Sequence, residues 1–305
     1  MRYDIIADGV LFPEGPVALP NGELLVCEMG RNRLIRIARD GKKTTVAEID
    51  GCPNGAAIGP DGACYICNNG GFEWGTMPDG IFRPIGPAKN YTGGSIDRVD
   101  LKTGKVTKLY TQVDGRKLIG PNDLVFDRDG GLWFSDLGKT RAREMDLCGA
   151  YYAKIDGSLI REVAHPFYGA NGIGLSPDDK TLYVAETPTG RLWAFDILGP
   201  GKVSNAGWLS TNGGRAVYTL PGIQRCDSMA VEANGNICVA TLRTGAITVV
   251  SPGGHLVELV TFPDPMVTNI CFGGDTLTTA YVTLSGTGKI ARMEWARPGH
   301  KLAFN

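Results

Sequence analysis

The chain has 305 residues, of which 43% are hydrophobic, and its formal net charge at pH 7 is −1. This length fits two ordinary domains or one large all-β domain, and the apolar content is sufficient for a substantial core. The balanced charge and the absence of a basic stripe argue against a nucleic-acid-binding protein. No apolar run approaches the length that crosses a membrane, so no membrane partner is expected.

The N-terminal residues and the eight cysteines predict a cytoplasmic protein. The first residues, MRYDIIADGVLFPEG, lack a charged segment followed by an apolar one, so we expect no signal peptide. The cysteines are scattered, mostly in apolar strand-like runs, which is typical of reduced, partly buried thiols. Cys64 and Cys67 form a C-x-x-C, but in a strand they point to opposite faces, and no second pair completes a zinc site.

The first predicted element is a strand at residues 3–7, and it has no partner in the sequence that follows it directly. From residue 14 onward one pattern recurs six times: a polar residue heads a short apolar run, which is followed by a turn and a second apolar run. The heads are Glu14, Asn54, Asn122, Asn171, Asp227 and Asn269. A repeat of roughly 40 to 70 residues built from short strands predicts a solenoid or a propeller.

The third repeat shows the full unit, with predicted strands at residues 124–126, 132–135, 151–155 and 160–163. Dipeptides such as Asn-Gly and Asp-Gly separate these runs and are hairpin turns, since Gly, Asn and Asp accept positive φ. Six units of four antiparallel strands predict an all-β, six-bladed β-propeller that occupies residues 1–305 as a single domain. The sixth unit lacks its last strand, so we expect the N-terminal strand to close the ring.

Residues 72–94, FEWGTMPDGIFRPIGPAKNYTGG, lengthen the second repeat. The segment is rich in Gly, Pro and aromatic residues and shows no periodicity, so it is predicted to be an irregular loop. It follows the second strand of its blade and must emerge at the same end of the ring as the six heads. Long loops in such positions are usually functional or disordered.

The heads of the inner strands form a ring around one mouth of a propeller. Here the ring holds two carboxylates and four carboxamides, a set of hard oxygen ligands that suits Ca²⁺, Mg²⁺ or Mn²⁺ and tolerates Zn²⁺. Few protein ligands would leave open positions for water and substrate, as in catalytic metal sites. The alternative is that Asn at a strand head simply makes a turn, and this alternative is strongest for Asn54 and Asn269.

Four segments resemble the gluconolactonase and senescence-marker-protein family, which includes regucalcin and sugar-acid lactonases. They are LFPEGPVALPNGELLV, GPNDLVFDRDGGLWFSD, ANGIGLSPDDKTLYVAETPTGRLWAFD and CDSMAVEANGNICVAT, in chain order. The resemblance covers essentially the whole chain. It implies a six-bladed propeller with one divalent metal ion on its axis.

The resemblance also implies roles for individual residues. Glu14, Asn171 and Asp227 would be metal ligands, Asp227 would also be the catalytic base, and Asn122 would lie beside the metal and contact it or the substrate. Regucalcin-like members carry an arginine that grips substrate hydroxyls two residues before the equivalent of Asn122. Here that position is Gly120, so the substrate need not be the same.

Further substrate-binding residues are predicted from position along the chain. Asn54 and Asn269 complete the ring, and Arg141 lies in the loop after the second strand of blade three. Phe72 and Trp74 belong to the long insertion, which we expect to cover the substrate as a lid and set its size. The alternative for the insertion is a surface loop that packs on blade two or mediates oligomer contacts.

Two acids and the histidines have less specific interpretations. Glu28 and Glu186 end second strands, where they either support the ring or pair with a nearby arginine. His255 and His300 are expected at the surface. No G-x-S-x-G elbow or Ser-His-Asp arrangement is present in the sequence.

Together these patterns predict a metal-dependent hydrolase of a lactone, most of all a sugar-acid lactone. The metal would polarise the carbonyl, and a water, on the metal or held by Asp227, would attack it. Two alternatives remain: an aryl-esterase or organophosphatase, and a non-catalytic metal-binding propeller. A strictosidine-synthase-like propeller is disfavoured, because it predicts no axial metal ligands.

Overall fold

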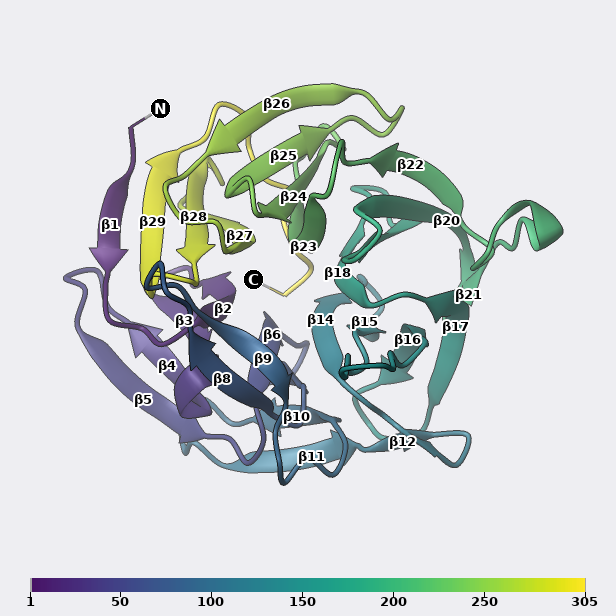
Figure 1. The fold of residues 1–305 in the computed structure, drawn as a ribbon, viewed down its shortest axis with the longest axis horizontal. Coiled ribbons are helices and arrows are strands. Elements are labelled where there is room, and N and C mark those ends of the chain that lie inside the picture. The colour runs from purple at the N-terminus through teal and green to yellow at the C-terminus, as the bar shows by residue number, and fades with distance from the viewer. Residues whose placement is uncertain (1, 305) are drawn as a thin grey trace.

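The computed structural model describes residues 2–304, which form a closed ring of six four-stranded antiparallel sheets (Figure 1). Short runs rich in β-branched and aromatic residues, separated by glycine turns, form the strands. Blade one contains β2 (Pro13–Ala18), β3 (Leu24–Glu28), β4 (Arg33–Ile37) and β5 (Lys43–Glu48). Blade two contains β6 (Pro53–Ile58), β7 (Cys64–Asn68), β10 (Ser95–Val99) and β11 (Val106–Tyr110).

The next two blades follow the same order from the axis outward. Blade three contains β14 (Pro121–Phe126), β15 (Gly131–Asp136), β16 (Cys148–Lys154) and β17 (Ile160–Phe167). Blade four contains β18 (Ala170–Leu175), β19 (Thr181–Glu186), β20 (Arg191–Gly199) and β22 (Arg215–Thr219), and the short β21 (Lys202–Val203) also pairs with β20. The four strands predicted for the third repeat are therefore confirmed.

Blade five contains β23 (Arg225–Val231), β24 (Ile237–Leu242), β25 (Ala246–Val250) and β26 (Leu256–Thr261). Blade six contains β27 (Val267–Gly273), β28 (Thr279–Leu284), β29 (Lys289–Glu294) and β1 (Asp4–Ala7). The N-terminal strand β1 pairs antiparallel with β29, with Asp4 opposite Arg292. The predicted closure of the ring by the N-terminal strand is confirmed, because β1 is the outermost strand of a blade whose other three strands come from the C-terminal part of the chain.

The core lies between neighbouring blades, where apolar side chains from facing sheets pack together. Cys64 and Cys67 belong to two different apolar clusters, as expected for residues on opposite faces of one strand. All eight cysteines are free thiols. Over residues 2–304 the only helices are two 3₁₀ turns, Met29–Arg31 and Gly207–Leu209, so no helix in this range is long and apolar enough to cross a membrane.

Two hairpins lie outside the blades. The small one contains β12 (Gln112–Val113) and β13 (Arg116–Lys117), and the large one contains β8 (Phe72–Thr76) and β9 (Phe82–Pro87). The prediction of an irregular loop for residues 72–94 was therefore wrong in its conformation. The turn Pro78–Gly80 closes the large hairpin, and Trp74 stacks on Phe82 across it at 4.9 Å between ring centroids. Cross-strand aromatic pairs of this kind stabilise a hairpin without any alternating pattern.

Candidate metal and substrate site

The six predicted head residues all lie at the start of inner strands, and each of these strands is irregular at that point. The pairing register with the second strand shifts at residues 14–17, 53–56, 121–124, 170–173, 226–229 and 267–269. Such bulges redirect side chains out of the regular alternation and are common next to active sites. Each sequence repeat thus contains an irregularity in strand pairing at its head residue.

Glycines that follow some heads allow neighbouring blades to meet closely at this level. A Cβ atom on Gly55 would lie 2.6 Å from the carbonyl oxygen of Asn122, and one on Gly172 would lie 2.6 Å from the carbonyl oxygen of Asp227. Both distances are too short for a side chain. The inner strands therefore converge at the heads, which brings the polar side chains of different blades together.

Side chains from adjacent blades contact one another within the ring. Asn269 donates from Nδ2 to Oε2 of Glu14 at 2.9 Å, and the same oxygen accepts the N–H of Gly15 at 2.8 Å. On the other side of the ring, the hydroxyl of Ser228 lies 3.5 Å from Oδ1 of Asn171. Every head residue is buried, with exposed fractions of 3% for Glu14 and 8% for Asp227. The structure therefore brings all six predicted residues to one place.

The carboxyl groups at this place are electrostatically crowded. Burial and the charge of Glu14 raise the pKa of Asp227 well above its usual range, and the charge of Asp123 adds to the effect. Burial also raises the pKa of Glu14, although hydrogen bonds from Asn269, Gly15 and Thr268 oppose this. Three acids thus face one another where water is excluded, and their charges are not compensated.

Asp123 is the functional candidate that the sequence analysis missed. Burial and the charge of Glu14 raise its pKa to about 7, while hydrogen bonds from Leu124, Ser228 and Ile173 act in the opposite direction. The available signal was its position directly after Asn122, where the repeats headed by Glu14, Asn54 and Asn171 have glycine. The sequence pattern instead directed the predicted role to the preceding residue, Asn122.

The oxygen atoms of this ring fit a divalent cation. Oδ1 of Asn122 is buried and has no hydrogen-bond donor, and a buried acceptor without a partner is costly unless a ligand satisfies it. Within residues 2–304 no group of three or more His, Cys, Asp or Glu side chains makes a metal site. Amide oxygens such as that of Asn171 would therefore have to complete the coordination of any ion between Glu14 and Asp227.

A cavity lies beside the ring on the propeller axis, and the C-terminal tail contributes to its lining. Gly15, Asp123 and Asn269 lie at one end of this cavity of about 390 Å³, and residues 300–304 line the other. Phe304 packs edge-on against Phe126, and Figure 1 shows the C-terminus near the centre of the ring. His300, which was expected at the surface, is half-buried beside this cavity.

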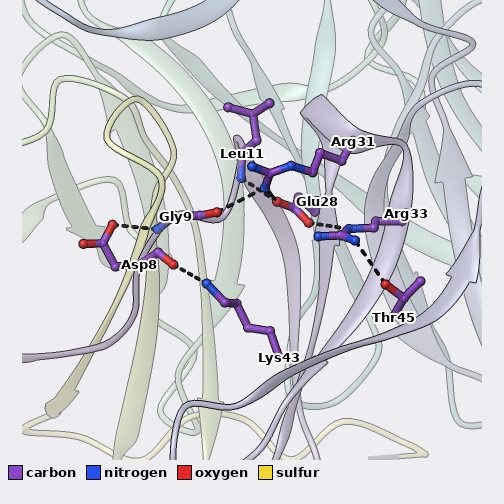
Figure 2. Close-up of polar contacts among 8 residues, drawn as sticks. All are labelled: Asp8, Gly9, Leu11, Glu28, Arg31, Arg33, Lys43 and Thr45. Atoms are coloured by element: carbon purple, nitrogen blue, oxygen red, sulfur yellow. Dashed lines mark hydrogen bonds and ion pairs between the residues drawn. The ribbon is translucent and has the colours of Figure 1, made fainter.

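The role of Glu28 is resolved by its contacts at the end of β3, the second strand of blade one (Figure 2). Its carboxylate accepts the N–H of Leu11 at 2.8 Å and pairs with Arg33 at 2.6 Å and with Arg31. Burial opposes ionisation, but these three donors together lower the pKa of Glu28. Because Leu11 lies three residues before Glu14, the pairing with arginine also fixes the segment that leads into the ring.

The same arrangement recurs in other blades. Glu186 accepts the N–H of Tyr168, three residues before Asn171, at 2.8 Å. Asp136 accepts the N–H groups of Ile119 and Gly120 at 2.8 and 2.7 Å, just before Asn122. In blades one, three and four, an acid at the end of the second strand thus holds the segment that leads into the inner strand, which is how these acids support the ring.

Arg141 lies at the rim of blade three, where its guanidinium is paired within its own loop. Its Nη1 is 3.1 Å from both carboxylate oxygens of Asp146. This exposed pair leaves Arg141 less free to bind a substrate than a guanidinium without a partner. Its predicted contact with substrate stays a prediction.

Phe72 and Trp74 belong to an apolar cluster that attaches the hairpin to blade one. Phe12, Met29 and Cys52 form its buried part, and the partly buried Phe72, Trp74, Phe82 and Met266 pack against them. Both aromatic residues also line a pocket of about 510 Å³ beside the hairpin base, which none of the six head residues reaches. Their predicted contact with substrate stays a prediction, and their visible role is to anchor the hairpin.

The hairpin crosses the mouth side of blade one and reaches blade six (Figure 1). The N–H of Phe82 donates to the carbonyl oxygen of Gly286, between β28 and β29, at 3.1 Å. At its base, the buried Lys139 of blade three donates to Asn69 and, at 3.1 Å, to the carbonyl of Gly71. The insertion thus emerges on the ring side, as predicted, and is held at both ends.

Three arginines lie on this side of the molecule. Arg225 is the first residue of β23, Arg243 follows β24, and Arg83 belongs to β9. Burial and the positive charges of Arg243 and Arg83 lower the pKa of Arg225. Sequence reasoning missed this group because its members come from distant segments, two from blade five and one from the insertion.

Comparison with known proteins agrees with this architecture. Residues 12–286 match the SMP-30/gluconolactonase/LRE-like region. The chain belongs to this family. It is 28% identical to a lactonase named drp35 of Staphylococcus saprophyticus, over 79% of this chain and 67% of that protein. It is 30% identical to a diisopropyl-fluorophosphatase of Loligo vulgaris, over 94% of this chain and 90% of that protein.

Solved structures of this family have the same fold. A gluconolactonase from Xanthomonas campestris superposes with a TM-score of 0.74 at 21% identity, covering 98% of this chain and 89% of that one. A calcium-binding regucalcin from Agrobacterium tumefaciens gives a TM-score of 0.75 at 17% identity, covering 99% and 98% of the two chains. The predicted six-bladed propeller and the predicted family are both confirmed.

Proposed function

We propose that this protein is a metal-dependent lactonase that hydrolyses a sugar-acid lactone. The observation that carries the proposal is the crowding of Glu14, Asp123 and Asp227 on the propeller axis. Within residues 2–304 none of these acids forms an ion pair with a lysine, arginine or histidine. Buried carboxylates without a partner favour binding of a cation. Membership of the family and similarity to a lactonase support the same activity.

Glu14, Asn171 and Asp227 would hold the metal through their side-chain oxygens. When bound, a divalent ion neutralises the two carboxylates and polarises the lactone carbonyl, which stabilises negative charge on its oxygen. The oxygen-only ligands favour Ca²⁺, Mg²⁺ or Mn²⁺ and tolerate Zn²⁺. Asn122, whose Oδ1 has no hydrogen-bond partner among residues 2–304, is free to accept a hydrogen bond from a substrate hydroxyl.

Asp227 supplies the proton transfer. Its carboxylate takes a proton from a water as the water oxygen bonds to the carbonyl carbon. The bond between this carbon and the ring oxygen then breaks, and Asp227 returns the proton to the departing oxygen, which becomes a hydroxyl group. The product is an open-chain hydroxy acid, which releases one proton to solvent at neutral pH.

The test is a panel of aldonolactones assayed with and without a chelator, after metal analysis of the untreated protein. We expect about one equivalent of a divalent metal, turnover of at least one lactone, and loss of turnover with chelator that added metal restores. Lactone turnover that resists complete metal removal would contradict the proposal.

Hydrolysis of phosphotriesters is the second candidate. It is favoured by the 30% identity to the diisopropyl-fluorophosphatase, which extends over 94% of this chain. The same ring could polarise a phosphoryl oxygen in place of a carbonyl oxygen. Comparing kcat/KM for a lactone and a fluorophosphate on one preparation distinguishes the two candidates, and the larger value identifies the preferred substrate class.

A further inference from the structure

Arg83, Arg225 and Arg243 are carried by segments that adjoin on the side of the ring covered by the hairpin. Arg225 begins β23 and precedes Asp227 by two residues. It lies opposite Leu242, the last residue of β24, so Arg243 follows at the same end of blade five. Two guanidiniums therefore originate on the mouth side of the catalytic aspartate.

The hairpin adds the third guanidinium. The N–H of Arg243 donates to the carbonyl of Pro265 at 2.7 Å, and the next residue, Met266, belongs to the apolar cluster beneath the hairpin. A Cβ atom on Gly286 would lie 2.9 Å from Ile81 and 3.1 Å from Met266. The start of β9, which carries Arg83, is therefore attached to the same corner of the mouth between blades five and six.

These three side chains have no anionic partner in the protein. Over residues 2–304 none of them takes part in a salt bridge or donates a side-chain hydrogen bond, whereas the exposed Arg98, Arg141 and Arg292 each pair with an aspartate. Arg243 also adopts a φ of 74°, an unusual value for a residue other than glycine. The acid at this corner is Asp264, and its carboxylate accepts the N–H groups of Met266 and Thr287. Like charges that lie close together without a salt bridge favour the binding of an anion.

The chemistry of the guanidinium limits what that anion can be. Its planar set of N–H donors matches the two oxygens of a carboxylate or of a phosphate. The arginines lie beside the ring, so the anion must belong to a molecule whose other end reaches Asp227. The chain as a whole has a net charge of −1, so this positive charge is local and suits a small ligand better than a polyanionic polymer.

We propose that Arg83, Arg225 and Arg243 bind an ionised acid group on the substrate, so that the preferred lactone carries a second, anionic group. This inference rests on the lactonase function proposed above and adds the substrate class. The arginines lie apart from the reacting carbonyl, hence their contribution is to bind and orient the substrate. A carboxylate and a phosphate ester share the chemistry required.

The test compares D-glucaro-1,4-lactone with D-glucono-1,4-lactone, which differ only in a carboxylate in place of a hydroxymethyl group. A lactone 6-phosphate provides the phosphate arm. We expect a kcat/KM at least about 10-fold higher for one of the anionic lactones, the scale of a charge-assisted hydrogen bond. In Arg225→Gln and in Arg83→Gln this preference should fall by about 10-fold or more.

Arg116→Gln is the matched control, because it removes an exposed guanidinium from β13 that lies beside Glu162 of β17, the outermost strand of blade three. It should leave the preference of the wild-type protein unchanged. Arg83→Gln guards against indirect effects on Asp227, since Arg83 belongs to a different element. A larger effect on the phosphorylated lactone would identify phosphate as the group, and a larger effect on the glucaro-lactone would identify carboxylate.

Equal kcat/KM for neutral and anionic lactones, or a preference that both arginine variants retain, would overturn the inference and leave the lactonase function intact. A binding measurement distinguishes failure of the proposed arginine site from failure of the proposed lactonase function. With Ca²⁺ added, calorimetry should show tighter binding of D-glucarate than of D-gluconate, and Arg225→Gln should remove the difference. This result would stand without lactone turnover, whereas equal affinities would count against the arginine site.

Discussion

Two groups of buried acids differ in their charge environment. The rim acids, Glu28 and Glu232, each lie at or directly after the end of a blade strand, and the axial acids, Glu14 and Asp227, lie in the ring of head residues. At the rim, Glu28 is 1% exposed and Glu232 is fully buried, and each is paired with arginine. On the axis, Glu14 and Asp227 are similarly buried, and the charges that raise the pKa of Asp227, besides burial, are those of Glu14 and Asp123. Burial alone therefore does not distinguish the two groups.

The difference lies in the donors that each carboxylate receives. Glu232 accepts hydrogen bonds from Trp295 and Asn236 as well as from Arg297, and against the cost of burial these donors lower its pKa. Asp227 has no cationic donor, and its pKa is raised. The charge of Glu232 is compensated by groups of the chain itself, whereas no arginine or lysine of residues 2–304 pairs with Asp227.

Replacing the catalytic acid should have the largest effect. Asp227→Asn removes a base and half of the negative charge of the expected metal ligands, so we expect kcat/KM for a lactone to fall by about 10² to 10⁴-fold. Circular dichroism should show an unchanged fold. Asp97→Asn is the control, because it replaces a buried carboxyl group of blade two away from the axis. Activity of Asp227→Asn within a few-fold of wild type would refute the mechanism.

The stability of the protein should depend on pH in opposite ways for the axial acids and for the rim acids. In the metal-free protein the raised pKa of Asp123, about 7, means that the folded state keeps a proton which the unfolded state has lost. Stability should therefore fall as pH rises from about 4 to above 7, by on the order of 4 kcal/mol for a shift of about three pKa units. Urea unfolding across this range measures the slope.

Added divalent metal should flatten that slope, because it compensates the ionised carboxylates. The rim acids act in the opposite direction: the lowered pKa of Glu28 contributes stability above about pH 4, and this contribution is lost at lower pH. A metal-free protein whose stability rises steadily between pH 4 and 7 would show that the axial acids are compensated within the chain.

At the rim, removing an acid should cost stability. Glu28→Ala removes the carboxylate that accepts Nε of Arg33 and the N–H of Leu11, so we expect a loss of about 3 kcal/mol in the free energy of unfolding. Glu28→Gln, which keeps a hydrogen-bond acceptor, should cost less. If Glu28→Ala is as stable as wild type, the contacts in Figure 2 contribute little and the contrast with the axis disappears.

The ring and its closure were predictable from sequence because the six repeats carry their own register. A polar head, an apolar run and a glycine turn recur at each inner strand. Residues 3–7 are predicted to form a strand that has no partner in the sequence that follows it. Glu14, Asn171 and Asp227 could be singled out for the same reason. Position in a repeat determines position around the axis.

What was missed depends on contacts between distant segments. The hairpin at residues 72–94 is stabilised by aromatic packing on Phe12 and Met29 of blade one, so no local alternation signals its strands. The position of the C-terminal tail along the central cavity likewise arises from tertiary contacts. The proximity of Arg83 to Arg225 does so as well. Asp123 was a different case, since its signal was local and lay beside a residue that already had an assignment.

The smallest predicted effect concerns Asp123, and it tests whether the axial acids are crowded in the metal-free protein. Asp123→Asn removes one of the facing charges but keeps an oxygen that can accept the N–H of Leu124, which now donates to the carboxylate at 2.9 Å. We therefore expect metal-free stability at pH 8 to rise by about 1 kcal/mol and the fall in stability between pH 4 and 7 to become shallower.

Asp97→Asn provides the matched comparison for this variant. Asp97 is also buried with a raised pKa, but it accepts hydrogen bonds from Asn68 and Ser95 at 2.7 Å each. Its replacement should destabilise the protein equally with and without metal. If Asp123→Asn also destabilises the metal-free protein and leaves the pH slope unchanged, Asp123 is a structural acid like those of the rim, and the charge available to bind a cation rests on Glu14 and Asp227 alone.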